Sequence, residues 1–491
     1  MADPSVSAVA ARANRTRWWV LVVVCLAMFM NALDSSIVNV ALPEIQRDLH
    51  FTQAGLTWVV DAFLITFGSM LLMAGRLGDL VGRKHVFLSG VVLFTASSVL
   101  CGIAPDQAVL ITGRFLQGAG GALSASVIVA IIVTEFPDPG DRARALSAYI
   151  FVAVGGGSIG LLVGGVITQV LSWHWIFFIN VPVGVLTFVF GRILIDENVG
   201  LGVRGGVDIA GSLLVTAALM VGIYAIVTAG EEGWGSDHTM GFGALALILL
   251  TSFFLLEAKR ANPIMPLRIL RIRSLTSSSI VRGFLATGMF STFFLGALYF
   301  EKVLGYKPIQ TGLAFLPMSL SIAVMSAGIT RRLVDRFGSR TVLVPATMAA
   351  VGGLLILATA GAHPVFALDV LPGLLLIGLG AGASFIPLLT MAMADVPGQD
   401  AGLGSGIVNV SMQMTSAVGL AVLSTVAAER TKSLLGEGSA TTAALVGGYR
   451  LAFLVAAAFV GVGTLLVLVL LHDAEDEAED APGDPSFGAV H

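Results

Sequence analysis

The sequence predicts an all-α membrane protein whose chain crosses the bilayer about fourteen times. Hydrophobic residues make up 56% of the 491 residues and charged residues only 12%, about half the charged share that is usual in soluble proteins. The apolar residues also form runs of about twenty, the length that a helix needs to cross a hydrocarbon core of about 30 Å. A large soluble core would divide such runs into shorter amphipathic pieces.

Charged residues and Gly- or Pro-rich breaks separate the apolar spans. The first span follows Arg12, Arg15 and Arg17. It continues without a small-residue cleavage site at the right distance, so we expect a retained helix rather than a signal peptide. The expected spans are 18–42, 56–77, 85–104, 107–134, 146–170, 175–194, 207–229, 240–257, 279–303, 311–330, 341–360, 365–393, 402–427 and 449–471.

Lys and Arg are unevenly distributed across this topology. With the N-terminus inside, 19 of the 27 fall in inner segments and six in outer segments. The positive-inside rule then predicts that both ends are cytoplasmic, in a bacterial inner membrane. We expect 1–17 to be a cytoplasmic segment and the acidic stretch 472–491 to be a disordered cytoplasmic tail.

A repeated loop motif predicts two halves. RLGDLVGRK (76–84) stands between spans two and three, and RLVDRFGSR (332–340) between spans ten and eleven. Two six-helix halves alone would put the second copy between helices eight and nine, so two helices have been inserted. We expect an N-terminal half at 18–194, an inserted pair with linkers at 195–275 and a C-terminal half at 276–471. Transporters with such parallel repeats hold their substrate between the halves, near mid-membrane.

Four motifs carry a family resemblance over residues 18 to 471. They are LDSSIVNVALP (33–43), GRLGDLVGRK (75–84), RFLQGAGGA (114–122) and WHWIFFINVPVG (173–184). With them the chain resembles the fourteen-helix drug:proton antiporters of the major facilitator superfamily. The resemblance implies the major facilitator fold and export of lipophilic compounds in exchange for protons. The chain departs from the family pattern at Ser147 and Leu161, usually Gly and Pro, and at His174 and Met412, usually Arg.

Asp34, Asp61 and Arg114 are the candidate proton-coupling residues. A charge within hydrocarbon is costly, so an intramembrane charge is a functional hypothesis by default. Counting about 1.5 Å per residue, all three lie at a similar depth, roughly 6–10 Å below the outer face. We expect them to face the bundle interior, with the two acids also attracting cationic or neutral substrates. The alternatives are a fixed ion pair that orients helices and, for Asp61, a wet outer vestibule.

Three amides are candidate substrate-binding residues. Gln117 follows Arg114 by three positions and shares its helical face. Asn409 and Gln413 are spaced four apart among methionines, which form adaptable surfaces. Hydrogen bonding between helices is the alternative for this pair.

A further set of residues is expected to serve conformational change. Asp79 and Arg83 would pair as a latch and Gly82 would permit a tight turn. The alternative, a plain positive-inside topology signal, explains Arg83 and Lys84 but not Asp79. A smooth glycine groove on the fifth helix would allow sliding, with close packing as the alternative. The full set is Gly75, Gly78, Asp79, Gly82, Arg83, Gly156, Gly160, Gly164 and Gly165.

Other classes of function lack their residues. No Gly-Lys pair exists for a P-loop, the seven histidines fall in expected loops, span ends or the tail, and no basic tract suggests nucleic-acid binding. We therefore expect no enzyme, cofactor or metal site, and a monomer whose partners are a small lipophilic molecule, protons and the bilayer. Cys25 and Cys101 are expected to stay unpaired, and Glu301 and Asp369 to be solvated at outer helix ends. A lipid exporter or a transporter-like sensor remains an alternative.

Overall fold

The described part of the chain is built of helices. The structure, a computed structural model, describes residues 4–197, 209–260, 263, 268–396 and 401–470, and contains no strand within them. Eleven helices in these ranges are long and apolar enough to cross a membrane, and three shorter apolar helices cover Gly55–Leu71, Leu213–Ala229 and Pro308–Val324. The predicted all-α membrane fold is confirmed. The tail at 472–491 lies outside the described residues.

The N-terminal half consists of seven helices that replace the six predicted spans. Asp106 and Asp138 begin two of them, because each carboxylate accepts a hydrogen bond from a first-turn N–H at 2.9 Å. The helices are α1 (Pro4–Asp48), α2 (Trp58–Val81), α3 (Arg83–Gly102), α4 (Gln107–Glu135), α5 (Pro139–Val170), α6 (Trp175–Phe178) and α7 (Asn180–Leu194), with a 3₁₀ turn at Gly55–Thr57.

The C-terminal half repeats this plan with more irregular helices. The span expected at 311–330 ends in a π-helical turn, Met325–Ile329, where Gly328 has a φ of 131°. The helices are α10 (Arg273–Lys302), α11 (Pro308–Val324), α12 (Thr330–Phe337), α13 (Ser339–Thr359), α14 (Leu371–Met393), α15 (Ala401–Gly436) and α16 (Thr441–Leu470), with a 3₁₀ turn at Ile269–Arg271 and a second π-helical turn at Phe366–Val370.

Several predicted boundaries differ from the structure, and the first helix and the span at 175–194 are two examples. The first helix does not stop at residue 42 but continues through Pro43 to Asp48, because hydropathy registers the loss of apolar residues and not the end of helical hydrogen bonding. The span predicted at 175–194 is divided between α6 and α7.

The helices between the halves, α8 (Ile209–Glu232) and α9 (Asp237–Lys259), form a hairpin against the bundle. The Thr216 hydroxyl on α8 donates to Ser69 on α2 at 2.7 Å, and the Thr425 hydroxyl on α15 donates to the Ile226 carbonyl at 3.2 Å. The α8 helix therefore contacts both halves.

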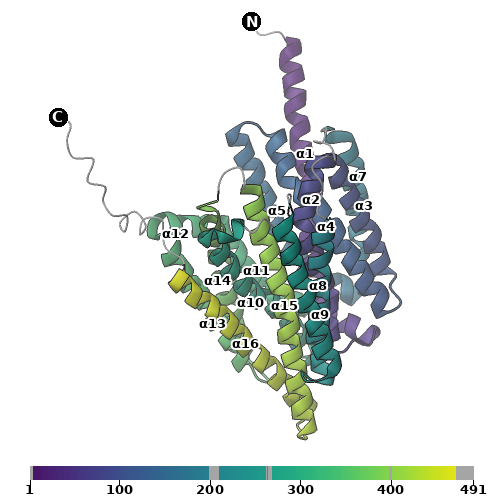
Figure 1. Cartoon of the computed structure of the whole chain (residues 1–491), viewed down its shortest axis with the longest axis vertical. Coiled ribbons are helices and arrows are strands. Elements are labelled where there is room, and N and C mark those ends of the chain that lie inside the picture. Colours follow the sequence, from purple (N-terminus) through teal and green to yellow (C-terminus); the bar gives the residue numbers. More distant parts are fainter. Residues whose placement is uncertain (1–3, 198–208, 261–262, 264–267, 397–400, 471–491) are drawn as a thin grey trace, which may run out of the picture.

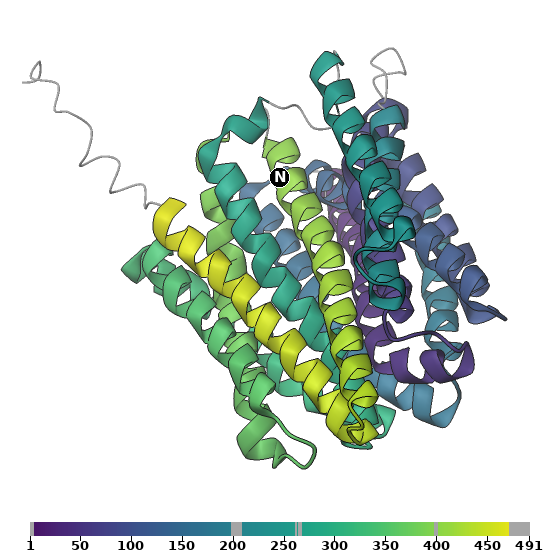
Figure 2. The same cartoon turned by 60° about the horizontal axis from the view of Figure 1, so that its bottom comes forward.

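The two halves meet closely at the end of the bundle opposite the N-terminus. A Cβ on Gly165 of α5 would lie 2.6 Å from the Pro308 carbonyl oxygen, and one on Gly312 of α11 would lie 2.5 Å from that of Leu161. Only glycine permits such an approach. Toward the end that carries the N-terminus, α13 and α16 lean away from the N-terminal half (Figure 1). Figure 2 shows the same bundle with its bottom turned toward the viewer, and α15 and α16 converge at their lower ends.

A buried polar cluster in the N-terminal half

Asp34 lies at the centre of a cluster of polar side chains from four helices. The carboxylate is completely buried. One of its oxygens forms an ion pair with the Arg114 guanidinium. The other accepts hydrogen bonds from the Gln117 amide at 3.1 Å and from the Asn180 amide at 2.9 Å. The charge is therefore paired and fully hydrogen-bonded, the condition under which a buried ion is tolerated.

Arg114 is held as firmly as its partner. The side chain is only 1% exposed. Its Nε donates to the Val59 carbonyl on α2 at 2.8 Å, and one terminal nitrogen donates to Gln117 at 2.8 Å. The guanidinium also lies 4.6 Å from the centre of the Phe63 ring and 5.9 Å from that of Phe177, so two aromatic faces add cation–π attraction.

Gln117 joins the ion pair to α3. It follows Arg114 by three residues on α4, so the two side chains project from one helical face. Its amide also donates to the Ser98 hydroxyl at 2.8 Å, and Cys101 lies 3.5 Å from its carbonyl oxygen. Both cysteines are free thiols, as expected.

Sequence reasoning missed Asn180 and Ser98. Asn180 begins α7, and its amide reaches Asp34 across 146 positions of sequence. The signal was present in the sequence, because Asn180 is the one amide in the apolar run WIFFINVPVG. A buried amide needs hydrogen-bond partners, so Asn180 could have been matched with an intramembrane acid such as Asp34.

Asp61 does not join this cluster. Its carboxyl group is completely buried, and neither oxygen has a hydrogen-bond partner among the described residues. The Thr57 hydroxyl, one turn earlier, donates to the Ala54 carbonyl at 2.8 Å. Gly68 follows Asp61 by seven residues. A Cβ atom added to Gly68 would lie 2.9 Å from the Gln413 side chain of α15. Seven residues are about two turns, so Asp61 lies on the face of α2 that is directed at the other half.

The amides predicted on α15 lie in the first half of that helix. Asn409 and Gln413 are both partly buried. The buried carbonyl oxygen of Gln413 has no partner within the described ranges, and its side chain packs on Gly68 of α2. Gln413 therefore sits where the halves meet.

The glycines of α5 pack against two different partners. Gly156 and Gly164 face α1, where a Cβ would lie 2.9 Å from Ala32 and 2.7 Å from Ile37. Gly160 faces Leu33 and Ser36 of the same helix, and Gly165 faces α11. This is the close-packing geometry that small residues allow between membrane helices.

The repeated loop motif forms the same turn in both halves. Gly82 has a φ of 109° and Gly338 a φ of 80°, a region that glycine enters without strain. Arg83 donates to the Thr134 hydroxyl at 2.8 Å and to the Ala130 carbonyl at 3.3 Å, which fastens the loop to α4. Gly75 and Gly78 lie beside α4 near Ser126 and Val127. The side chain of Asp79 lies outside the described residues.

One expectation about the helix ends is wrong. Glu301 was expected to be solvated, but its side chain is 3% exposed, because the C-terminal half closes against α1 at this point. Asp369 is only partly buried, and it accepts a hydrogen bond from the Val365 N–H at 2.7 Å.

The sequence pattern of the Major Facilitator Superfamily matches residues 24–420, four-fifths of the chain. The chain belongs to this superfamily. It is therefore a multi-pass membrane transporter protein by family, and the predicted resemblance is confirmed.

Several relatives align with more than four-fifths of the chain. The puromycin resistance protein pur8 of Streptomyces alboniger is 36% identical over 99% of this chain and 97% of its own. The multidrug resistance protein Stp of Mycobacterium tuberculosis is 35% identical over 84% and 76%, and the cephamycin export protein CmcT of Amycolatopsis lactamdurans is 34% identical over 85% and 86%.

Solved structures share the fold at low sequence identity. A bacterial homologue of the human lysosomal transporter Spinster, in an inward-facing and occupied conformation, has a TM-score of 0.66 at 14% identity, over 92% of this chain and 96% of that chain. The POT family transporter PepTSo has a TM-score of 0.65 at 14% identity, over 93% and 99%. These likenesses support the major facilitator fold.

Proposed function

We propose that this chain exports small lipophilic molecules, cationic or neutral, in exchange for protons. The observation that carries the proposal is the ion pair between Asp34 and Arg114, buried in a transporter whose relatives are named resistance and export proteins. Such a pair in a membrane interior is costly to assemble, and a proton is the simplest cation that can compete with Arg114 for the carboxylate. We expect no catalysis.

Proton binding at Asp34 would rearrange the cluster. A neutral carboxyl group gains an O–H donor, loses part of its acceptor capacity and no longer balances the guanidinium, so Arg114 must find another acceptor. Gln117 and the Val59 carbonyl already contact Arg114 and can hold it while α1 and α4 move. One proton entering the cell down a membrane potential supplies about 2.3 kcal/mol per 100 mV, which can drive this rearrangement.

Asp61 is the proposed second proton site. A buried carboxylate without donors is too costly to stay ionised, so we expect Asp61 to carry a proton when the halves are closed around it. When they part, water reaches the carboxyl group and the proton can leave. Asp34, Asp61, Gln117, Asn409 and Gln413 are the residues we propose to contact substrate.

The remaining predicted residues would serve the conformational change. We propose that Gly156, Gly160 and Gly164 let α5 slide on α1. The close contact between Gly165 of α5 and α11 would form when the halves close at this end and break when they open. Arg83, with Gly75, Gly78, Asp79 and Gly82, would hold the loop after α2 to α4 in one state. We expect the chain to do this as a monomer.

The proposed orientation places both termini in the cytoplasm. The end of the bundle opposite the N-terminus, where the two halves meet closely (the closed end), then lies outside. The 19-to-6 distribution of Lys and Arg supports it. A reporter fused after residue 235, between α8 and α9, should be periplasmic, and one fused after residue 265 should be cytoplasmic. Two reporters on the same side would remove the inserted helix pair from the topology.

Flux measurements on purified protein in vesicles test the proposal. The panel of compounds should contain cationic, neutral and anionic lipophiles. Transport should require an imposed proton gradient, and cationic and neutral compounds should be transported in preference to anionic ones. Export of phospholipid instead would support a lipid exporter, an alternative suggested by Leu161 in place of the antiporter proline. Saturable binding without flux would identify a sensor.

A further inference from the structure

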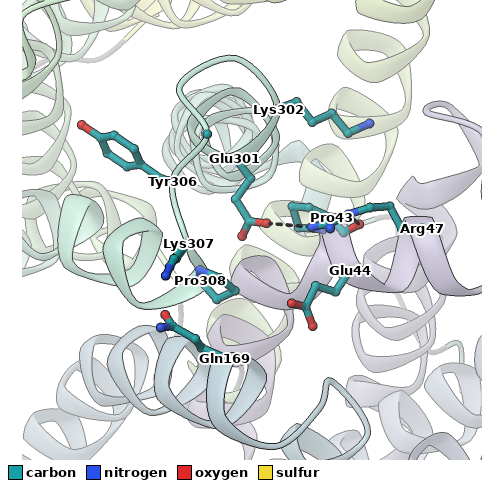
Figure 3. A pocket seen from close by; sticks show the side chains of 10 residues that line it. Pro43, Glu44, Arg47, Gln169, Glu301, Lys302, Tyr306, Lys307 and Pro308 are labelled. Carbon is teal, nitrogen blue, oxygen red and sulfur yellow. Dashed lines mark hydrogen bonds and ion pairs between the residues drawn. The ribbon is translucent and has the colours of Figure 1, made fainter.

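A pocket of about 630 Å³ lies where the two halves meet at the closed end. Pro43, Glu44 and Arg47 of α1 and Gln169 of α5 form one wall. The other consists of Glu301 and Lys302 of α10 with the segment Gly305–Pro308 that leads into α11. Figure 3 shows the Glu301 carboxylate directed across this junction at Arg47.

Glu301 is buried in the pocket wall without hydrogen bonds. Its side chain is 3% exposed, and neither oxygen has a hydrogen-bond partner among the described residues. The buried Thr311 hydroxyl of α11 is a neighbouring polar group, but it does not reach hydrogen-bond geometry. An ionised carboxylate in this setting keeps little of the stabilisation that water would give it.

Arg47 offsets little of this loss. Its nearest terminal nitrogen is 3.7 Å from the Glu301 oxygen, well beyond the 2.7–2.9 Å typical of a charge-assisted hydrogen bond. The Arg47 side chain is 71% exposed, and its Nε already donates to the Pro43 carbonyl at 3.3 Å. Water therefore competes well for this guanidinium.

The other charged groups around the pocket do not replace Arg47. Glu44 of α1 carries the same charge as Glu301 and points to another part of the pocket, Lys302 extends away from Glu301, and Lys307 lies toward Gln169 (Figure 3). Of the described cationic groups, Arg47 is the one that comes within ion-pair distance of Glu301. The closed junction thus encloses a carboxyl group that is easier to bury neutral than charged.

We propose that Glu301 is a proton-dependent closure site: the outer junction closes when Glu301 has taken a proton from the outside solution, and opens when that proton is lost. The direction follows from linkage, because the state that holds the proton more tightly is favoured at low pH. That state is the closed one, in which the carboxyl group is withdrawn from water. The word "outer" rests on the proposed orientation, but the closure itself does not depend on which compound is exported.

Distances between spin labels across the closed end test this role. Ile103 at the end of α3 and Leu435 near the end of α15 are exposed positions on opposite halves. Cysteines placed there, with Cys25→Ala and Cys101→Ala, accept the labels. Lowering the pH from about 8 to about 4, which crosses the ordinary Glu pKa of about 4.3, should shift the distribution toward short distances.

The variants separate Glu301 from other titrating groups. Glu301→Gln should keep short distances at both pH values, because the amide mimics the protonated acid. Arg47→Gln, a change at an exposed side chain, should lengthen the distances at high pH and still close at low pH. Glu44→Gln is the matched acid in the same pocket and should respond as the wild type does.

Two results would overturn the proposal. One is a wild-type distance distribution that does not change with pH, and the other is a Glu301→Gln variant that responds as the wild type does. Should Glu301→Gln not fold, a Glu301→Ala variant that responds to pH as the wild type does would overturn it equally. Failure of drug export in the vesicle assay leaves this readout untouched, so the two proposals fail separately.

Discussion

Asp34 and Asp61 are both completely buried, but Asp34 is surrounded by donors whereas Asp61 has no hydrogen-bond partner among the described residues. Asp34 contacts Arg114, Gln117 and Asn180 within the N-terminal half. Asp61 lies on the face of α2 that is directed at α15. An acid within one half can keep its partners while the halves move, whereas an acid between the halves changes its surroundings at every step. Equal depth in the membrane therefore does not mean equal chemistry.

Asp34→Asn should have the largest effect. The substitution leaves Arg114 buried without its counter-charge, and breaking a buried ion pair on one side costs about 3–5 kcal/mol. We expect lower thermal stability in detergent and loss of gradient-driven export. Depth alone would suggest the opposite for stability, since one buried charge has been removed. Unchanged melting together with full export would show that the cluster neither stabilises the fold nor carries protons.

Asn180→Leu tests whether the donors around Asp34 matter individually. Removing one hydrogen bond to a charged group costs about 1.5–3 kcal/mol, and the pH dependence of export should shift because the ionised carboxylate loses a donor. Asn39→Leu is a suitable control, since the Asn39 amide donates to carbonyls of its own helix, at 3.0 Å to Ser35. Equal shifts in both variants would mean that Asn180 acts only through packing.

Asp61→Asn should have the smallest effect on stability. No donor among the described residues loses a partner, so the loss of unfolding free energy should be clearly smaller than the roughly 3–5 kcal/mol expected for Asp34→Asn. Export should lose part of its dependence on the pH gradient, measured in the same vesicles as the Asp34 variant. A stability loss as large as that of Asp34→Asn would eliminate the difference between the two sites.

The Arg114 partnership was within reach of sequence reasoning. A bilayer offers no partners for charged side chains, so an Asp and an Arg at similar depth on two helices are forced toward each other. By the same reasoning, Asp61 is expected at this depth and facing the bundle interior; the structure buries Asp61, but gives its carboxyl group no hydrogen-bond partner among the described residues. Depth follows from counting residues along a helix, but the direction in which a side chain points depends on how that helix is rotated against its neighbours.

The membrane fold, the repeated loop and the presence of charges that must face inward can all be predicted from the amino-acid sequence. These follow from local rules: apolar length, glycine at a positive φ in Gly82 and Gly338, and the cost of charge in hydrocarbon. Which of these charges has a hydrogen-bond or ion-pair partner depends on how the helices pack in the tertiary structure. Asn180 reaches Asp34 from a distant helix, and Glu301, at a helix end that looks solvated in sequence, is buried because the other half closes over it. Burial of that kind is a property of two surfaces in contact, and neither surface encodes it alone.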